Sequence, residues 1–172
     1  LRPTYPNLAN NEGVLNLEYL KWSDLCTPRH NVTVPFTRML VGPMDYHLGG
    51  FRSMPPETFL AQNEKPFVMG TRCHHLAMYV VYDNPVPMVS DTPTAYIGEP
   101  GFDFIQQVPT TWDEIQFLKG EVGEFVVIAK RKGKQWFLGA MTNELEREIS
   151  VRVGFLAEDR YRMDAWSDVD AQ

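Results

Sequence analysis

The chain has 172 residues, enough for one ordinary domain with a sizeable core, and its 44% apolar and 22% charged residues are usual for a globular protein. The formal net charge of −6 argues against a nucleic-acid partner, because phosphate binding needs a basic surface. The apolar runs stay well short of the roughly 18–20 residues of a membrane span, so we expect no membrane span.

Residues 1–25 carry two glutamates, Glu12 and Glu18, on a predicted strand end and an irregular loop. Extended backbone places side chains at this even spacing on one side of the chain, whereas a helix turns the second by about 240°. Gly13 and the neighbouring asparagines disfavour a helix, so the two carboxylates can converge on one pocket. Two interpretations stay open: a proton donor beside a ligand for a hard cation such as Ca2+, or two solvated loop glutamates.

Residues 32–41 (VTVPFTRMLV) predict a strand leading into a turn, although Pro35 weakens this prediction. We expect His30 at the start of this strand, beside Arg29. There His30 either hydrogen-bonds a sugar hydroxyl or caps the loop. Residues 42–66 are predicted to be rich in loops, because glycine and proline pairs interrupt them.

The clearest helix is predicted to follow an N-cap at Thr71 and to end before Pro85, since the residue before proline is pushed out of the helical region. Its apolar positions keep helical spacing: Cys73, Leu76, Ala77, Val80 and Val81. We therefore expect Cys73 to be buried, and His74 and His75 to lie on the polar, exposed side.

A short apolar run over residues 86–89 follows this helix, and the order strand, loop, helix, strand predicts a βα-type unit. Asp45 and Asp91 come after apolar strands, where an active-site carboxylate or a turn-forming aspartate is expected; we favour the turn for both. A weaker helix is expected over residues 102–107.

The pattern changes near residue 111 from α/β to all-β. Residues 124–130 and 135–142 predict a hairpin around the basic segment 131–134, which we interpret as a solvated hairpin tip. Residues 149–155 alternate between apolar and polar and predict a half-buried antiparallel strand. A further strand is expected over residues 161–166.

The chain resembles glycoside hydrolase family 97, which contains α-glucosidases and α-galactosidases, in four segments: NNEGVLNLEY, TPRHNVTVPFTRMLVGPMDYHLGGF, GTRCHHLAMYVVYDNPVPMVSDTPTAY and VPTTWDEIQFLKGEVGEFVVIAKRKGKQWFLGAMTN. The resemblance implies a parent with an N-terminal β-sandwich, a catalytic (β/α)8 barrel and a C-terminal β domain. Residues 1–111 would then supply the last βα units of the barrel, and residues 112–172 an antiparallel β-sheet or sandwich domain.

The resemblance also implies site residues. Glu18 matches the general acid that protonates the leaving glycosidic oxygen. Glu12 matches a carboxylate ligand of the family's Ca2+ ion, with Glu18 as a further ligand, and His30 is a tentative substrate contact. The second catalytic carboxylate of the relatives precedes this chain, so we expect the 172 residues alone to be inactive. The sequence leaves retaining and inverting mechanisms open.

The expected substrate is an oligosaccharide with a terminal α-linked galactose or glucose, and the family implies a periplasmic or secreted parent. One departure stands at Arg29, where relatives often carry glutamate. The alternative hypothesis is a non-catalytic carbohydrate-binding or interface module.

Overall fold

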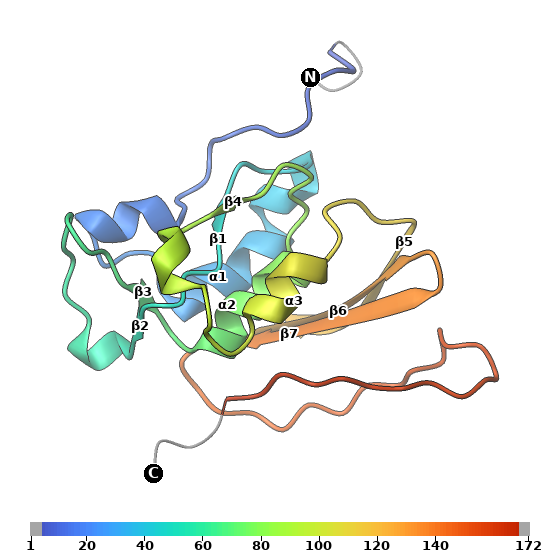
Figure 1. Cartoon of the computed structure of the whole chain (residues 1–172). Helices are drawn as coiled ribbons and strands as arrows, with labels where there is room; N and C mark the ends of the chain where they lie inside the picture. The colour runs from blue at the N-terminus through green and yellow to red at the C-terminus, as the bar shows by residue number, and fades with distance from the viewer. Residues whose placement is uncertain (1–4, 169–172) are drawn as a thin grey trace.

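The computed structural model describes residues 5–168. In this range the α-helices are α1 (Pro28–Thr33), α2 (Arg72–Val81) and α3 (Phe102–Gln107). The strands are β1 (His47–Leu48), β2 (Ser53–Met54), β3 (Val68–Met69), β4 (Met88–Val89), β5 (Glu114–Glu121), β6 (Phe125–Lys132) and β7 (Gln135–Thr142). Short 3-10 helices lie in several connections: η1 (Leu17–Lys21), η2 (Val34–Phe36), η3 (Arg38–Val41), η4 (Pro56–Thr58) and η5 (Pro93–Ala95). Figure 1 shows the helices gathered beside the sheet of β5, β6 and β7.

Strands β5, β6 and β7 form an antiparallel sheet in that order. Strands β6 and β7 confirm the predicted hairpin, with Lys132 paired with Gln135 at its end. The turn between them contains Gly133, whose φ of 58° glycine adopts without strain. Sequence reasoning missed β5, an edge strand whose residues alternate between half-buried and exposed.

Helix α2 begins and ends where the sequence predicts. The Thr71 hydroxyl accepts a hydrogen bond from the backbone N–H of His74 (3.2 Å), and the helix ends before Pro85. The prediction of exposed His74 and His75 is wrong, because these residues are 8% and 0% exposed. Helix α2 packs against β6 and β7 on one side and against β1 and α3 on others, so little of its circumference stays polar and solvated.

A continuous hydrophobic core joins the helical part of the chain to the sheet. Leu20, Tyr46 and Val80 from the first part and Val126 and Met141 from the sheet are buried in the same cluster. Burying apolar surface in this way is the main favourable term in folding. The domain boundary at residue 111 stays a prediction.

The predicted strand over residues 32–41 is wrong; the chain there forms the end of α1, then η2 and η3. Thr27 caps α1, since its hydroxyl accepts a hydrogen bond from His30 N (3.1 Å), and Pro28 occupies the first turn, where its fixed φ suits a helix. This local cap outweighs the β-branched residues that follow, whose helix penalty is only a few tenths of a kcal/mol each (~0.5).

The strands predicted over residues 149–155 and 161–166 are also wrong, because these residues have no strand pairing. In Figure 1 this segment runs as an extended chain along the sheet after β7. Phe155 packs on Trp136 of β7, with ring centroids 4.5 Å apart. Phe155 therefore contacts the sheet through its side chain, without a neighbouring strand to accept its backbone hydrogen bonds, whereas Val153 is 51% exposed.

Parallel pairing in the described residues is confined to short pairs. Strand β1 pairs with β4, β2 pairs with β3, and Asn11 makes an isolated bridge with Met44. The antiparallel sheet predicted after residue 111 is thus confirmed, whereas residues 5–110 close no barrel, and their assignment to one stays a prediction. Over residues 5–168 the structure has no helix long and apolar enough to cross a membrane.

Candidate functional site

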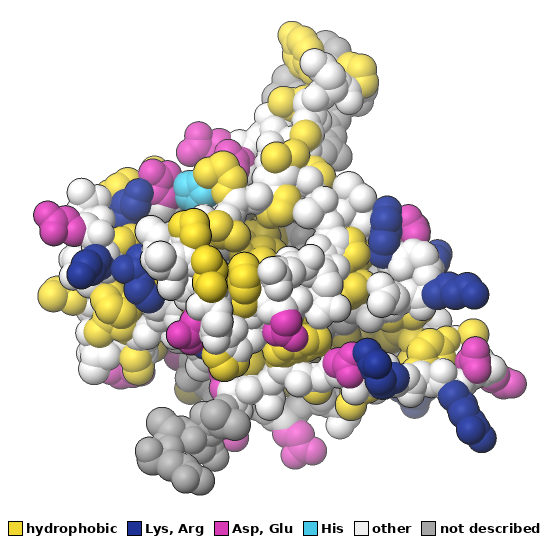
Figure 2. All heavy atoms as spheres, in the orientation of Figure 1, with side chains coloured by type: hydrophobic (Ala, Val, Ile, Leu, Met, Phe, Trp, Pro, Cys, Tyr) yellow, Lys and Arg dark blue, Asp and Glu magenta, His cyan; other side chains and the backbone are white. Residues whose placement is uncertain are grey.

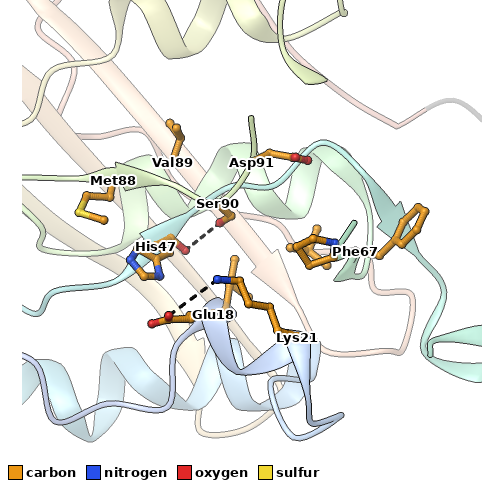
Figure 3. Close-up of a pocket in the computed structure, with 11 residues that line it drawn as sticks. Glu18, Lys21, His47, Phe67, Met88, Val89, Ser90 and Asp91 are labelled. Carbon is orange, nitrogen blue, oxygen red and sulfur yellow. Dashed lines mark hydrogen bonds and ion pairs between the residues drawn. The ribbon is translucent and has the colours of Figure 1, made fainter. Parts of the chain in front are cut away.

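A hollow of about 180 Å³ opens at the ends of the short parallel strands (Figure 3). It is formed by η1, by β1 and β4 with the residues that follow them, and by the approach to β3. The lining residues are Leu17, Glu18, Lys21, His47, Pro66, Phe67, Val68, Met88, Val89, Ser90 and Asp91. This volume lies below the 300–1,000 Å³ that is typical of small-molecule sites.

Glu18 is placed in the hollow by the 3-10 helix η1. The side chain of Asn16 accepts a hydrogen bond from Glu18 N (2.8 Å) and so caps this helix. Leu17 and Leu20 are buried beneath it, which turns the Glu18 side chain outward. Asn16 is itself 3% exposed, so the cap is anchored in the protein interior.

Lys21 is the nearest charged partner of Glu18. Its Nζ lies 3.8 Å from Glu18 Oε1, and both side chains are more than a third exposed, at 36% and 39%. Exposed ion pairs of this kind contribute between about 0 and 1 kcal/mol. A substrate that enters the hollow can therefore displace Lys21 from Glu18 at little cost, and Figure 3 shows both side chains facing His47 and Ser90.

The opposite wall of the hollow is a fixed polar element. Ser90 Oγ donates to the carbonyls of His47 (3.1 Å) and Leu48 (2.8 Å), which ties β4 to β1. Asp91 accepts hydrogen bonds from Arg52 Nε at 2.9 and 3.1 Å, and Arg52 Nη2 also pairs with Asp91 Oδ1. These hydrogen bonds raise the pKa of Arg52.

Asp91 was expected to form a turn, and its carboxylate does accept a hydrogen bond from Thr92 N (2.9 Å). Its side chain is only 3% exposed, however, and its main partner is Arg52. Sequence reasoning missed Arg52, Lys21 and His47. Of the Arg52–Asp91 pair, the sequence indicated only Asp91, because it follows an apolar run. Nothing local in the sequence indicates that Arg52 reaches a residue 39 positions away.

Glu12 lies outside the hollow on exposed backbone. Arg38 Nη2 donates to the carbonyls of Glu12 (3.0 Å) and Asn11 (2.8 Å). The bridge between Asn11 and Met44 fixes the same segment next to β1. The structure thus holds the backbone beside Glu12 firmly, but it does not bring Glu12 and Glu18 into one lining.

His30 lies in the middle of α1, not at the start of a strand. Its Nε2 is 2.7 Å from the carbonyl oxygen of Leu15, so the imidazole is hydrogen-bonded to the loop that joins Glu12 to Glu18. This contact makes His30 a support of the loop, and its tentative substrate contact stays a prediction.

The described residues do not gather a metal site. Nowhere in residues 5–168 do three or more His, Cys, Asp or Glu side chains come together in a way that could hold an ion. Ca2+ takes about six to eight oxygen ligands, which two separated glutamates do not provide. The donors within residues 5–168 therefore do not fit a complete Ca2+ shell.

A second hollow, of about 360 Å³, lies between the start of α2 and the end of β7. Cys73 lines it and is half-buried, so the prediction of a buried position is met in part. Burial raises the pKa of the Cys73 thiol to about 12, which makes the thiol a poor nucleophile at neutral pH.

Comparison with known proteins shows which family this chain resembles. Residues 111–172 match the family described as glycosyl-hydrolase 97 C-terminal, oligomerisation. The chain is 40% identical over 171 residues to a retaining alpha-galactosidase of Bacteroides thetaiotaomicron, covering 98% of this chain and 26% of that protein. It is 30% identical over 141 residues to a probable retaining alpha-galactosidase of Streptomyces bingchenggensis, covering 81% of this chain and 20% of that protein.

The structural comparison agrees. A glycoside hydrolase family 97 enzyme from a Pseudoalteromonas species, in complex with panose, superposes with a TM-score of 0.79 at 35% identity, covering 92% of this chain and 25% of that structure. The chain thus spans about a quarter of the length of these relatives. The similarity runs from the hollow at Glu18 through the sheet that matches the family's C-terminal domain, so the chain resembles a C-terminal portion of glycoside hydrolase family 97 enzymes.

Proposed function

We propose that this chain is part of a retaining α-glycosidase that removes terminal α-linked sugars from oligosaccharides, with α-galactosides as the favoured substrates. The observation that carries the proposal is the 40% identity to a retaining alpha-galactosidase over 98% of the chain. α-Glucosides are the second candidate, because the Pseudoalteromonas relative was obtained with panose.

Residues 1–111 would supply the closing part of a (β/α)8 barrel in the complete enzyme. The parallel pairing of β1 with β4 supports this proposal, since α2 lies between these strands in the sequence. The hollow at Glu18 lies beside the residues that follow β4, Ser90 and Asp91. Active sites of such barrels are built at the carboxyl ends of the strands.

Glu18 is the proposed general acid. Its carboxyl group, held outward by η1, would donate a proton to the bridging oxygen as the glycosidic bond breaks, and would accept a proton from water in the second half of a retaining reaction. His47, Lys21 and Asp91 line the same hollow and would orient the sugar. A second carboxylate, which the retaining reaction requires, is not assigned to this chain.

The test is Glu18→Gln in the full-length enzyme, with Glu64→Gln at an exposed loop position as the control. Loss of a general acid lowers hydrolysis of an unactivated α-galactoside by at least about 100-fold. A p-nitrophenyl α-galactoside needs little protonation of its leaving group, so its kcat/KM, which reports the first displacement, should fall far less. Near-wild-type kcat/KM on the unactivated substrate would refute the assignment, and so would an equal loss of kcat/KM on both substrates.

We also propose that Glu12 and Glu18 contribute to Ca2+ binding in the complete enzyme, with the remaining oxygen ligands supplied from outside residues 5–168. The preference of Ca2+ for carboxylate oxygens supports this, whereas the described residues alone do not form the site. After chelation, Glu12→Gln should raise the Ca2+ concentration needed for half-maximal activity by roughly tenfold, because one charged ligand of the ion is lost. An unchanged titration, with Glu64→Gln as the control, would contradict this.

The second candidate function, an interface module, is favoured by one observation for the sheet region. The family description for residues 111–172 names oligomerisation. Both functions are compatible in one protein, because the sheet and the hollow use different surfaces. Light scattering on the full-length protein, with and without residues 111–172, would test the assembly role independently of glycosidase activity.

A further inference from the structure

A buried lysine joins the sheet to helix α2. Lys130 lies in β6 and is 1% exposed. Its Nζ donates to the carbonyl oxygen of Tyr82 (2.9 Å), the residue that caps the C-terminus of α2. The last carbonyls of a helix lack partners within it, and a cation is favourable there because of the helix dipole. The ring centroid of Trp112 lies 5.5 Å from Nζ, so the ammonium also faces an aromatic surface.

A lysine in this position is costly. Burial lowers the pKa of Lys130 to about 8, against a smaller opposing effect of Asp83. A leucine or methionine would fill the same space without burying a charged amine. The presence of a lysine here indicates that its hydrogen bond to the Tyr82 carbonyl contributes more than the burial of its amine costs.

The residues directly after Tyr82 hold the two segments that precede His47 and Glu12 in the chain. The carbonyl of Asp83 accepts from Met44 N (3.1 Å). The side chain of Asn84, which is 6% exposed, donates to the carbonyl of Tyr46 (2.9 Å) and accepts from Asn10 Nδ2 (3.2 Å).

The first of these segments leads into the hollow, and the second leads to Glu12, which lies outside it. Residues 44–46 continue directly into His47 of the hollow, and residues 10–11 continue directly into Glu12. Asp45 N also donates to the carbonyl of Asn11 (2.8 Å), which ties the two segments to each other. A displacement at the end of α2 is therefore passed to both.

We propose that Lys130 is a positioning residue that couples the C-terminal sheet to the sugar site through the carbonyl of Tyr82 and the step from Asp83 to Asn84. The sheet thereby fixes the segments of His47 and Glu12 without contributing a side chain to the hollow. The part of this inference that concerns catalysis rests on the proposed glycosidase function; the coupling itself does not.

The test compares Lys130→Met with Lys132→Met in the full-length protein. Lys132 lies in the same strand, and its Nζ contacts Thr111 and Asp113 at the surface. Hydrogen exchange should become at least about tenfold faster at the amides of Met44 and Asp45 in Lys130→Met, since a buried carbonyl loses its donor. In Lys130→Met, exchange within the hairpin of β6 and β7 should stay unchanged. In Lys132→Met, exchange should stay unchanged throughout the protein.

Equal exchange at Met44 and Asp45 in both variants would overturn the coupling, and so would a uniform increase over the whole protein, which indicates only global destabilisation. If Lys130→Met does not fold, Asn84→Ser tests the same path, because it removes the links to Tyr46 and Asn10 without touching Lys130. It should speed exchange at the same two amides, and unchanged exchange would overturn the proposal.

Activity separates the two proposals. In an active enzyme, Lys130→Met should lower kcat for an α-galactoside by about tenfold with KM changed less than twofold, because misplaced groups affect the transition state more than binding. An unchanged kcat would overturn the positioning role. If the wild-type protein shows no glycosidase activity while the local exchange result holds, the proposed function fails and the coupling stands.

Discussion

At the scale of single residues, His74 and His75 make stability depend on pH. Burial lowers the pKa of His74 to about 3 and that of His75 to about 4, from 6.5. Between these values and 6.5 the unfolded chain binds more protons than the folded chain, so the free energy of unfolding falls as the pH falls. The loss between pH 8 and pH 5 is on the order of 2 kcal/mol for each histidine.

Urea unfolding at pH 8 and pH 5 measures this loss. His75→Gln should reduce it by about half, because one of the two buried imidazoles is gone and one remains. His47→Gln, a substitution at the half-buried histidine of the hollow, controls for the loss of any imidazole. A stability that does not change between these pH values would contradict the prediction.

The same two residues show where residue-scale prediction from sequence ends. The helical spacing of Leu76 and Val80 correctly predicts an apolar side of α2. It does not indicate that Asn31 of α1 approaches from another side and contacts His74 Nε2 (3.2 Å), or that the carbonyl of Met69 accepts from His75. Asn31 is 43 residues away from His74 and Met69 lies outside the helix, so a histidine there looks exposed until the fold is known.

At the scale of elements, the contact between α2 and the sheet depends on Gly139 of β7. A Cβ at this position would lie 2.9 Å from Val80 Cβ, 3.0 Å from the carbonyl of Ala77 and 3.0 Å from Val81 Cγ2. Gly139→Ala should therefore destabilise the protein by about 1–3 kcal/mol, the usual cost of overpacking. Gly154→Ala is the matched control, because no atom lies within 4 Å of its added Cβ.

Thermal or urea unfolding of both variants checks this prediction. If Gly139→Ala unfolds at the same denaturant concentration as Gly154→Ala, helix and sheet are not in the close contact described. The test also bears on Lys130, since its reach to Tyr82 requires the same close approach.

Elements were predictable where their signals are local and complete. The hairpin has its glycine turn at Gly133, and α2 has a cap at Thr71 and a stop at Pro85. The segment 32–41 misled because composition favoured a strand while the Thr27 cap, located outside it, decided for a helix. The segment 149–155 misled because alternation does not reveal whether a partner strand is present, and none pairs with it in the described residues.

At the scale of the whole molecule, the site is shared between residues that are remote in sequence. The family resemblance singled out Glu18, which lines the hollow, and its role as general acid stays a prediction; the wall of His47, Ser90 and Asp91 depends on the pairing of β1 with β4. The hollow has a volume of about 180 Å³, and the chain covers about a quarter of the relatives' length, so the proposed sugar site would be completed by residues outside this chain.

The stereochemistry of the reaction follows from the proposed retaining class and can be measured on the full-length enzyme. Proton NMR during the first minutes of hydrolysis of an α-galactoside should show the α-anomer of galactose first, before mutarotation. A retaining enzyme places its two carboxyl groups about 5–5.5 Å apart, so that the second attacks the sugar directly and each of two displacements inverts the anomeric carbon. An inverting enzyme spaces them by about 6.5–9.5 Å for an intervening water, and the β-anomer would then appear first. That outcome would leave Glu18 as a candidate acid but would exclude the retaining α-galactosidase assignment, and Glu64→Gln should not alter the anomer in either case.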